Sequence, residues 1–250
     1  MRVSIITVCF NSAKTIEDTI KSVLGQDYNN IEYIVVDGGS TDETLEILSR
    51  YKNKISRIAS EPDEGIYDAM NKGIKMATGE IIGFLNSGDI YMSESVAGQI
   101  VDSIKANNAD CCYGDLQYVA KNDLQKILRR WKSQPYSDGL FEKGWHPPHP
   151  TFFVKKSVFD KYGGFDLGYS IASDYELMLR FLEKHSVKSC YIPEVLVKMR
   201  IGGMSNKNLW HIAKANIQCF QAWKRNDLKV SLFIMLKKPV SKLFQYMKRS

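Results

Sequence analysis

The sequence lacks a hydrophobic run long enough to cross a membrane, and it lacks the cysteine spacing of a disulfide-rich or zinc-binding protein. No apolar stretch approaches the roughly 18 residues that a membrane-spanning helix needs. The five cysteines are odd in number and scattered, with no CxxC pair, which favours a reducing compartment. We expect no secretory signal, because the apolar residues 3–10 lack a cleavage site and lead directly into a polar helix start. These absences predict a cytoplasmic protein.

An evenly distributed basic charge is also missing. The net charge is +6, and residues 228–250 hold six basic side chains and no acid. Removing these six from the 34 lysines and arginines leaves 28, which equals the number of aspartates and glutamates. A protein that binds nucleic acid usually carries its charge on a face of the fold. Here the charge belongs to a tail, so we expect no nucleic-acid partner.

Strand-like and helix-like segments alternate through the first half of the chain. Apolar runs predict four buried strands, at residues 3–9, 31–36, 55–59 and 81–85. Apolar residues at helical spacing follow each run, Ser12 and Thr41 stand where helix caps are expected, and Gly79 stands where a helix would end. This alternation predicts an α/β fold with a Rossmann-like, mostly parallel sheet flanked by helices on both faces.

The pattern changes after residue 110. The expected elements are a hairpin (residues 116–119 with 126–131), a long loop (133–150), a strand (151–154), two helices (157–162 and 173–183) and two further strands (188–192 and 195–199). Another helical stripe begins at Leu209. We therefore expect a domain at residues 1–205 and a basic, amphipathic C-terminal helical tail at residues 206–250.

The apolar run at residues 81–85 ends in four residues that carry oxygen ligands or a flexible backbone: Asn86, Ser87, Gly88 and Asp89. The carboxyl edge of a buried strand is where open α/β sheets bind ligands. Asp89 is a hard oxygen donor of the kind that Mg²⁺ or Mn²⁺ prefers. The same residue types are common in turns, so this stretch alone leaves a metal site and a simple turn equally open.

Two other acidic residues lie at or near the carboxyl ends of expected strands. Asp37 follows the run at residues 31–36, and Asp115 follows an apolar segment at residues 109–113. The carboxyl ends of parallel strands share one edge, so Asp37 and Asp89 are expected to face a common cleft. For Asp115 we favour a turn.

Six short motifs occur in a fixed order along the chain: T-V-C-F-N at 7–11, D-G-G-S-T-D at 37–42, N-S-G-D at 86–89, H-P-T-F-F at 149–153, G-G-F-D at 163–166 and S-D-Y-E-L-M-L-R at 173–180. Together they resemble glycosyltransferase family 2, whose fold is called GT-A. The resemblance covers residues 3–205. The stretch E-P-D-E-G-I-Y-D-A-M-N at 61–71 is similar to bacterial members that build exopolysaccharide or O-antigen chains.

The resemblance implies a nucleotide-sugar site, and the donor that it leads us to expect is a UDP-sugar. The residues that it assigns to the donor are Thr7, Phe10, Asn11, Asp37, Asp68, Asn71, Lys72 and His149. Thr7, Phe10 and Asp37 would line the base pocket, and His149 would lie near the diphosphate or the acceptor. For Lys72, a solvated helix face is an equal alternative. For His149, packing within its loop is the alternative that the residues alone favour.

The resemblance also implies a metal ligand and a catalytic base. Asp89 matches the last acid of the family's metal motif, although Asn86 and Gly88 stand where acids often occur. The expected cofactor is Mg²⁺ or Mn²⁺, because one carboxylate with diphosphate oxygens and water can hold such an ion. Asp174 would be the base, with Glu176 as a weaker candidate. Without the resemblance, Asp174 would be interpreted as a first-turn acid that stabilises its helix.

The activity that these roles imply is transfer of a sugar, with inversion, to a hydroxyl of a glycan or polyprenyl-linked acceptor. Asp174 would accept the proton of that hydroxyl. A nucleotidyltransferase is the alternative enzyme, although Asn11-Ser12-Ala13-Lys14 is a poor version of its phosphate loop. A non-catalytic nucleotide-sugar-binding or membrane-binding module is the alternative from another class, and it would need no base such as Asp174.

The basic tail suggests where the protein works. In residues 240–247, Val240, Leu243, Phe244 and Met247 follow helical spacing, and Pro239 separates them from an earlier apolar segment. One explanation of the stripe is packing on the domain. A basic helix without acids also suits an anionic bilayer, so we expect residues 228–250 to hold the protein peripherally on the inner face of the cell membrane.

Overall fold

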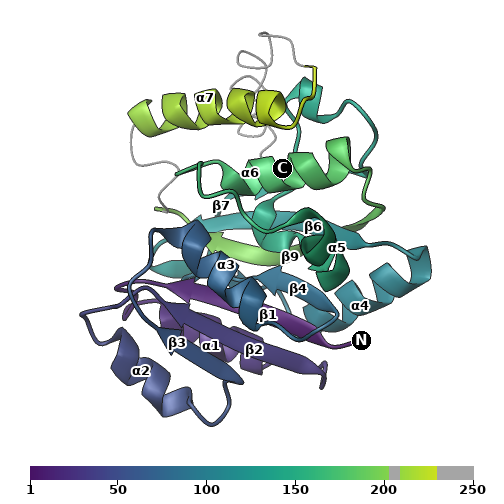
Figure 1. The fold of residues 1–250 in the computed structure, drawn as a ribbon. Coiled ribbons are helices and arrows are strands. Elements are labelled where there is room, and N and C mark those ends of the chain that lie inside the picture. Colours follow the sequence, from purple (N-terminus) through teal and green to yellow (C-terminus); the bar gives the residue numbers. More distant parts are fainter. Residues whose placement is uncertain (203–208, 230–250) are drawn as a thin grey trace.

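The computed structural model describes residues 1–202 and 209–229. A mixed sheet runs through the molecule in the order β3-β2-β1-β4-β8-β6-β9-β5, with β7 paired to β6 (Figure 1). Its strands are β1 (Val3–Cys9), β2 (Ile31–Asp37), β3 (Arg57–Ser60), β4 (Ile81–Phe84), β5 (Ile90–Tyr91), β6 (Cys111–Ala120), β7 (Asp123–Trp131), β8 (Phe153–Lys155) and β9 (Ser189–Arg200). Parallel pairs account for most of the paired residues.

Strands β1 to β4 form the parallel half of the sheet. Every residue of β1 is buried, because β1 lies between β2 and β4 and has helices on both faces. Ile6 pairs with Ile34 of β2 on one side and with Phe84 of β4 on the other. Because these strands run in the same direction, their carboxyl ends share one edge. Asp37 and the turn at residues 86–89 lie along that edge, as expected.

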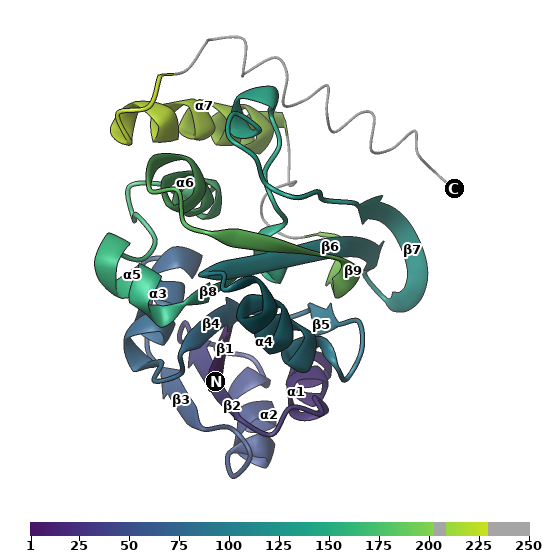
Figure 2. The same cartoon turned by 90° about the vertical axis from the view of Figure 1, so that its right-hand side faces the viewer.

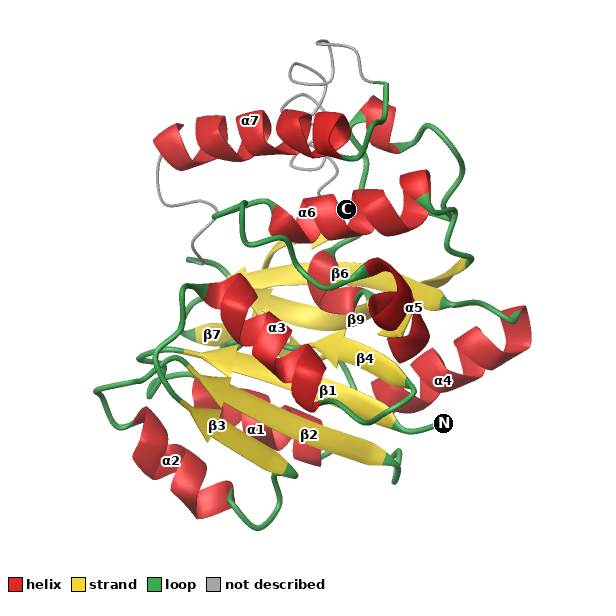
Figure 3. Cartoon of the chain, viewed as in Figure 1, coloured by secondary structure: helices red, strands yellow, loops and turns green. Residues whose placement is uncertain are grey.

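Helices cover both faces of the sheet (Figure 3). They are α1 (Ile16–Leu24), α2 (Thr44–Tyr51), α3 (Ile66–Met76), α4 (Val96–Asn107), α5 (Lys156–Tyr162), α6 (Ser173–Leu179) and α7 (Leu209–Arg225). One core lies between the sheet and α1, α2 and α4, and the other contains residues of α3, α5, α6 and α7. The predicted α/β architecture with helices on both faces is confirmed. Among the described residues, no helix has both the length and the apolar character needed to cross a bilayer.

The second half of the chain is more irregular. The hairpin of β6 and β7 is confirmed and longer than expected, since the apolar segment at residues 109–113 continues into β6. The long loop contains short 3₁₀ turns at Phe141–Lys143 and His149–Thr151. Helix α6 continues into a π-helical turn at Arg180–Lys184. Together these two segments occupy the helix expected at residues 173–183.

Several local expectations were wrong, among them the turn favoured for Asp115, which lies within β6. The two strands expected at residues 188–192 and 195–199 are one strand, β9, whose register against β6 shifts between Tyr191 and Val195. Pro193 lies within this shift, and it has no N–H group to donate to the ladder. Ser12 and Thr41 do not cap helices with their side chains, since α1 begins after Thr15 and α2 after Glu43.

Gly79 does not end α3, because that helix stops at Met76 and its C-cap residue is the extended Ala77. The glycine instead permits a close approach between backbones. A Cβ atom at residue 79 would lie 2.6 Å from Ser4 Oγ and 2.9 Å from the carbonyl oxygen of Arg2. A glycine is therefore required at residue 79 by the neighbouring strand β1 and not by the end of the helix.

Helix α7 packs against α6 on the side away from the sheet (Figure 2). Cys219, Ala222 and Trp223 of α7 are buried in the same core as α6. The described part of the C-terminal segment expected at residues 206–250 is therefore in direct contact with the body of the protein. The amphipathic stripe expected at residues 240–247 lies outside the described residues.

Candidate functional site

Asp37 lies at the carboxyl end of β2 with its carboxylate fully enclosed by hydrogen-bond donors. The N–H groups of Gly39 and Ser40 donate to Oδ2 over 3.1 and 3.0 Å, and Ser60 Oγ donates over 2.8 Å. The Ser40 hydroxyl donates to Oδ1 over 2.5 Å. Burial alone would raise the pKa of Asp37, but the hydrogen bonds from Ser40 and Ser60 outweigh it and lower the pKa below its usual value. Asp37 therefore remains an anion that fixes the loop after β2.

The loop after β1 is hydrogen-bonded to the loop that surrounds the Asp37 carboxylate. Asn11 has a left-handed backbone, with φ of 47°. Its N–H donates to Ser40 Oγ over 2.8 Å, and its Oδ1 accepts the N–H of Thr41 over 2.9 Å. Next to it, the Phe10 side chain is 60% exposed. An exposed aromatic ring at the carboxyl edge of the sheet is available to stack on a planar ligand.

Thr7 is placed differently. It is fully buried, its hydroxyl donates to the carbonyl oxygen of Leu85 over 2.8 Å, and it accepts a hydrogen bond from Tyr33. The hydroxyl is therefore engaged inside the protein. Any influence of Thr7 on a bound base has to pass through the backbone and its neighbours.

Asp63 is a residue of this edge that the sequence reasoning missed. Its carboxylate lies directly over Gly38, so that a Cβ atom at residue 38 would collide with Oδ2 of Asp63. The other oxygen, Oδ1, accepts the N–H of Gly65 over 2.9 Å. The only signal in the sequence was the pair Gly38-Gly39, which leaves the space after Asp37 open to a side chain from elsewhere.

Lys72 neutralises the acidic loop that leads into α3. Its Nζ lies 3.0 Å from Glu61 Oε1 and 3.3 Å from Asp68 Oδ2, and it donates to the carbonyl oxygen of Pro62 over 2.9 Å. Asp68 also accepts the N–H of Glu64 over 3.2 Å. Lys72 and Asp68 thus shape the loop that carries Asp63.

Asn71 links α3 to the second half of the chain. Its Nδ2 donates to the carbonyl oxygen of Phe165 over 2.8 Å, and its Oδ1 accepts the N–H of the same residue over 2.8 Å. Both ends of the amide are used by one backbone unit. Asn71 therefore holds the segment at residues 163–166 against α3.

Asp89 differs electrostatically from Asp37. It is buried beside Arg200, whose Nη1 donates to the carbonyl oxygen of Gly88 over 2.8 Å. Burial raises the pKa of Asp89 to about 8, although a backbone hydrogen bond from Arg200 and the charge of that residue oppose the rise. Burial thus disfavours the anion, and a bound cation would favour it.

The turn at residues 86–89 offers hard oxygen donors. Oδ1 of Asn86 is buried without a hydrogen-bond partner, and it lies in the same turn as the Asp89 carboxyl. No group of three or more histidine, cysteine, aspartate or glutamate side chains suitable for a metal occurs in residues 1–202 and 209–229. A carboxylate with one amide oxygen fits Mg²⁺ or Mn²⁺ if a ligand and water complete the shell.

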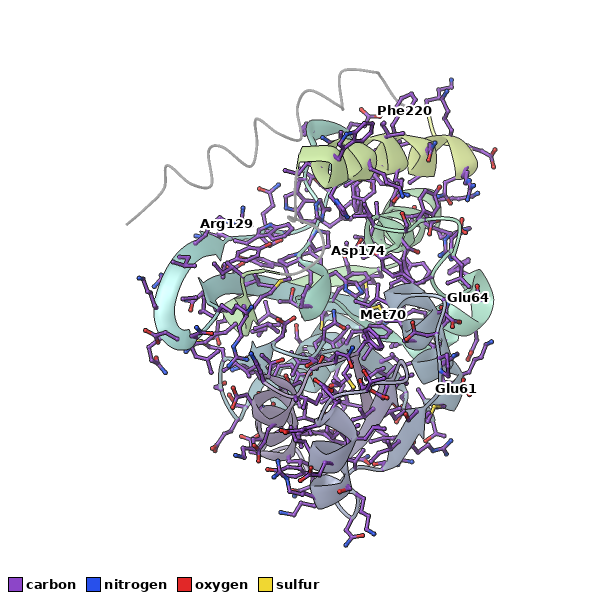
Figure 4. The ribbon with its side chains drawn as sticks, turned by 90° about the vertical axis from the view of Figure 1, so that its left-hand side faces the viewer. Glu61, Glu64, Met70, Arg129, Asp174 and Phe220 are labelled. Atoms are coloured by element: carbon purple, nitrogen blue, oxygen red, sulfur yellow. The ribbon has the colours of Figure 1, made fainter. Side chains whose placement is uncertain are left out.

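Asp174 lies in the first turn of α6, where α6 meets α3 (Figure 4). The hydroxyl of Tyr67, on α3, lies 3.2 Å from Asp174 Oδ1 and donates to the carbonyl oxygen of Ile171 over 2.5 Å. Burial, together with the charge of Asp174, raises the pKa of Tyr67 well above its usual value. The tyrosine therefore stays protonated, and its one hydrogen is shared between the carbonyl oxygen of Ile171 and the more distant carboxylate of Asp174. Glu176 is occupied instead by Arg180 and Asn226.

His149 packs among aromatic rings between the two halves. Its ring centroid is 5.6 Å from that of Phe84 and 5.5 Å from that of Phe165. Burial lowers the pKa of His149, and the negative charge of Asp174 opposes this only in part. The imidazole is therefore held in its neutral form, within the electrostatic range of Asp174.

The sequence model of Glycosyl transferase family 2 matches residues 4–163 of the chain. An uncharacterized glycosyltransferase of Mycobacterium tuberculosis is 37% identical over 180 residues, which cover 71% of this chain and 68% of that protein. The chain belongs to glycosyl transferase family 2. A PGL/p-HBAD biosynthesis glycosyltransferase of Mycobacterium bovis is 29% identical over 208 residues, covering 81% of this chain and 78% of that protein.

Solved structures show the same GT-A fold. Staphylococcus aureus TarS in complex with UDP-GlcNAc superposes with a TM-score of 0.69 at 18% identity, covering all of this chain and 72% of that one. A mannosyltransferase from Pyrobaculum calidifontis, in complex with GDP-Man and Mn²⁺, gives a TM-score of 0.64 at 17% identity, covering all of this chain and 76% of that one. The resemblance drawn from the sequence motifs, and the fold it implied, are confirmed.

The lowered pKa of His149 makes this glycosyltransferase less stable in mild acid. A histidine whose pKa is lowered in the fold favours the folded state fully only above its unfolded value of about 6.5, and this stability is lost as the pH falls below that value. We expect the melting temperature between pH 7.5 and pH 5.0 to move downward relative to that of His149→Phe, because the raised pKa of Asp89 acts in the opposite direction in both proteins. His149→Phe keeps an aromatic ring between Phe84 and Phe165 but cannot titrate, so its melting temperature should lack this downward shift. An equal change in both proteins would contradict the neutral imidazole.

Proposed function

We propose that this glycosyltransferase transfers a sugar, with inversion, from a UDP-sugar to a hydroxyl of a glycan or polyprenyl-linked acceptor in bacterial surface polysaccharide synthesis. One contact carries the proposal, the approach of the Tyr67 hydroxyl to Asp174 Oδ1 at 3.2 Å. It joins a carboxylate from the second half of the chain to a helix of the nucleotide-binding half. A donor at the edge of the sheet and a base for the acceptor can then share one site.

The donor would lie along the carboxyl edge of β1 and β2. Phe10 offers an exposed ring for the base, and Asp37 with Asn11 keeps the two loops in place. Asp63 over Gly38 adds an acceptor oxygen beside them. A uracil ring has an N–H group that such an oxygen can bind. TarS is known in complex with UDP and UDP-GlcNAc, which favours UDP for this chain as well.

Asp174 would act as the base. The acceptor hydroxyl attacks the anomeric carbon as its proton moves to Asp174, and the bond from that carbon to the diphosphate oxygen breaks with both electrons leaving on UDP. A single displacement of this kind inverts the anomeric configuration. Tyr67 keeps one oxygen of Asp174 oriented, and this leaves the other available to the hydroxyl.

Asp89 and Asn86 would hold the divalent ion together with the diphosphate. Their oxygens match the ligands that Mg²⁺ and Mn²⁺ prefer. The bound ion supplies positive charge that offsets the charge developing on the departing diphosphate. The mannosyltransferase that is similar in fold was solved with Mn²⁺, which supports a metal in this site.

Thermal shifts test the donor and the metal together. UDP with Mn²⁺ at 100 times its Kd should stabilise the fold by about 2.7 kcal/mol, and each kcal/mol should raise the melting temperature by about 2–4 °C in a chain of this size. Asp89→Asn should fold, because burial already favours the neutral acid, but it should lose the part of the shift that depends on metal. If GDP shifts the melting temperature and UDP does not, the donor assignment is wrong. An unchanged metal effect in Asp89→Asn would exclude Asp89 as a ligand.

Asp174→Asn tests the base. The change removes the proton acceptor with little change in volume, so transfer should fall by about 10²–10⁴-fold while the Kd of UDP stays within twofold. Asp160→Asn is the matched control, because Asp160 is exposed on α5 and pairs with Lys156 at the surface of the protein. Transfer at the wild-type rate by Asp174→Asn would reduce Asp174 to a helix-stabilising residue.

The C-terminal part of the chain would bind the protein peripherally to the inner face of the membrane. Helix α7 contains no acidic residue, and its outward side exposes Trp210, Lys214 and Ile217. Residues 228–250 continue this character with six basic side chains and no acid. Each basic residue near an anionic surface contributes about 1 kcal/mol. Such a contact would bring the enzyme to a polyprenyl-linked acceptor.

Sedimentation with vesicles tests this attachment. Binding should require anionic lipid, weaken with salt, and fall strongly when residues 230–250 are deleted, a change that leaves every described residue present. In the full chain, Trp210→Ser should also weaken binding to the vesicles, because the exposed indole is lost. Equal binding to neutral vesicles, or no binding to either kind, would contradict a membrane role and leave packing on the domain as the explanation of the tail.

A further inference from the structure

Helix α7 contacts the segment that precedes α6 through a buried side chain, Gln218, in addition to the exposed Arg225, which pairs with Asp166. Gln218 Oε1 accepts two backbone N–H groups, from Ile171 over 3.0 Å and from Ala172 over 3.1 Å. Its Nε2 donates to Ser170 Oγ over 3.1 Å. Only 7% of Gln218 is exposed to solvent. Every polar atom of this side chain is therefore engaged with residues 170–172.

These N–H groups lie at and just before the N-cap of α6. The first N–H groups of a helix have no partner within it and are usually satisfied by a serine, threonine, aspartate or asparagine at the N-cap. The N-cap residue of α6 is Ala172, which makes no side-chain cap. Gln218 instead binds, from α7, the N–H groups of Ala172 and of Ile171 before it, and so fixes the backbone that leads into α6.

The bond from Gln218 and the bond from Tyr67 act on the same residue. Gln218 accepts the N–H of Ile171, and Tyr67 donates to the carbonyl oxygen of Ile171 over 2.5 Å. The Tyr67 hydroxyl also contacts Asp174 Oδ1. Residue 171 is thus held from α7 on one side and from α3 on the other, three positions before Asp174.

We propose that Gln218 is a positioning residue for the base. It fixes residues 170–172, and with them the first turn of α6, so that Asp174 keeps its contact with Tyr67. The proposal rests on the proposed role of Asp174. Gln218 lies beyond the span that the family model matches, which ends at residue 163.

Other contacts keep α7 docked when Gln218 is changed. Trp223 Nε1 donates to the Tyr175 hydroxyl over 2.9 Å, and Asn226 Nδ2 donates to Glu176 Oε1 over 2.9 Å. Cys219 and Ala222 are buried in the shared core. A change at Gln218 should therefore alter the start of α6 more than the attachment of α7.

Three variants separate positioning from packing. Gln218→Leu keeps the size of the side chain and removes both hydrogen-bonding ends. Gln218→Glu retains two oxygens that can accept the N–H groups of Ile171 and Ala172, so it should restore most of the function. Gln221→Leu is the matched control, because Gln221 is a glutamine on the exposed side of the same helix.

Hydrogen–deuterium exchange tests the contact without any substrate. The amides of Ile171 and Ala172 should exchange at least tenfold faster in Gln218→Leu, whereas Gln218→Glu and Gln221→Leu should keep wild-type protection. Unchanged protection in Gln218→Leu would overturn the proposal, whatever the activity. This result does not depend on the role of Asp174.

Turnover tests the consequence. The probe is release of the nucleoside diphosphate from UDP-GlcNAc, UDP-glucose, UDP-galactose or GDP-mannose with Mn²⁺, using the sugar that gives the highest wild-type rate. Gln218→Leu should lower kcat by about 10–100-fold, as expected for a misplaced catalytic group, with the donor KM within twofold of wild type. Gln218→Glu and Gln221→Leu should stay near wild type.

A double-mutant cycle identifies the residue through which Gln218 acts. In an Asp174→Asn background, Gln218→Leu should change kcat by less than twofold, because the group that it positions is already gone. An equal fold loss in both backgrounds, or wild-type kcat in Gln218→Leu alone, would overturn the positioning role. If Asp174→Asn itself retains full activity, the proposed base fails, and the exchange result still decides the contact.

Discussion

The two halves of the site depend on helix α3. Tyr67 and Asn71 are four residues apart, so they lie on the same side of the helix. Asn71 holds the backbone of Phe165 with two hydrogen bonds, and Tyr67 holds Ile171 and contacts Asp174. Without these bonds the segment at residues 163–174 would be joined to the first half of the chain mainly by apolar contacts, which have no direction. Hydrogen bonds from a rigid helix fix where the carboxylate lies.

Two buried carboxylates at the same sheet edge have opposite electrostatics, and this difference separates their roles. Asp37 is surrounded by donors from Gly39, Ser40 and Ser60, which hold it as an anion with a lowered pKa. Burial raises the pKa of Asp89 to about 8. The first charge is already satisfied by the protein, so Asp37 serves the shape of the loops. For Asp89 burial favours the neutral acid despite the nearby Arg200, and its role as a metal ligand stays a prediction.

Much of the fold could be predicted from the sequence, because buried strands and amphipathic helices leave a local pattern of apolar residues. The order of motifs also identified the family, whereas the role of Asp174 as the base stays a prediction. Contacts between distant side chains leave no such pattern. Asp63 over Gly38, the enclosed hydroxyl of Thr7 and the link from Gln218 to residue 171 appear only when the elements are packed. The same is true of Gly79: a glycine is required there because β1 approaches closely, and not because α3 ends there.

The central claim is that one site joins the sheet edge of the first half to Asp174 of the second. A crystal structure of the protein with UDP and Mn²⁺ tests it most directly. The account predicts the uracil ring against Phe10, the ion on Asp89, and the diphosphate on the same side of the sheet edge as Asp174. UDP bound away from the carboxyl ends of β1 and β2, or Asp174 turned from the diphosphate with Tyr67 no longer in contact, would contradict it.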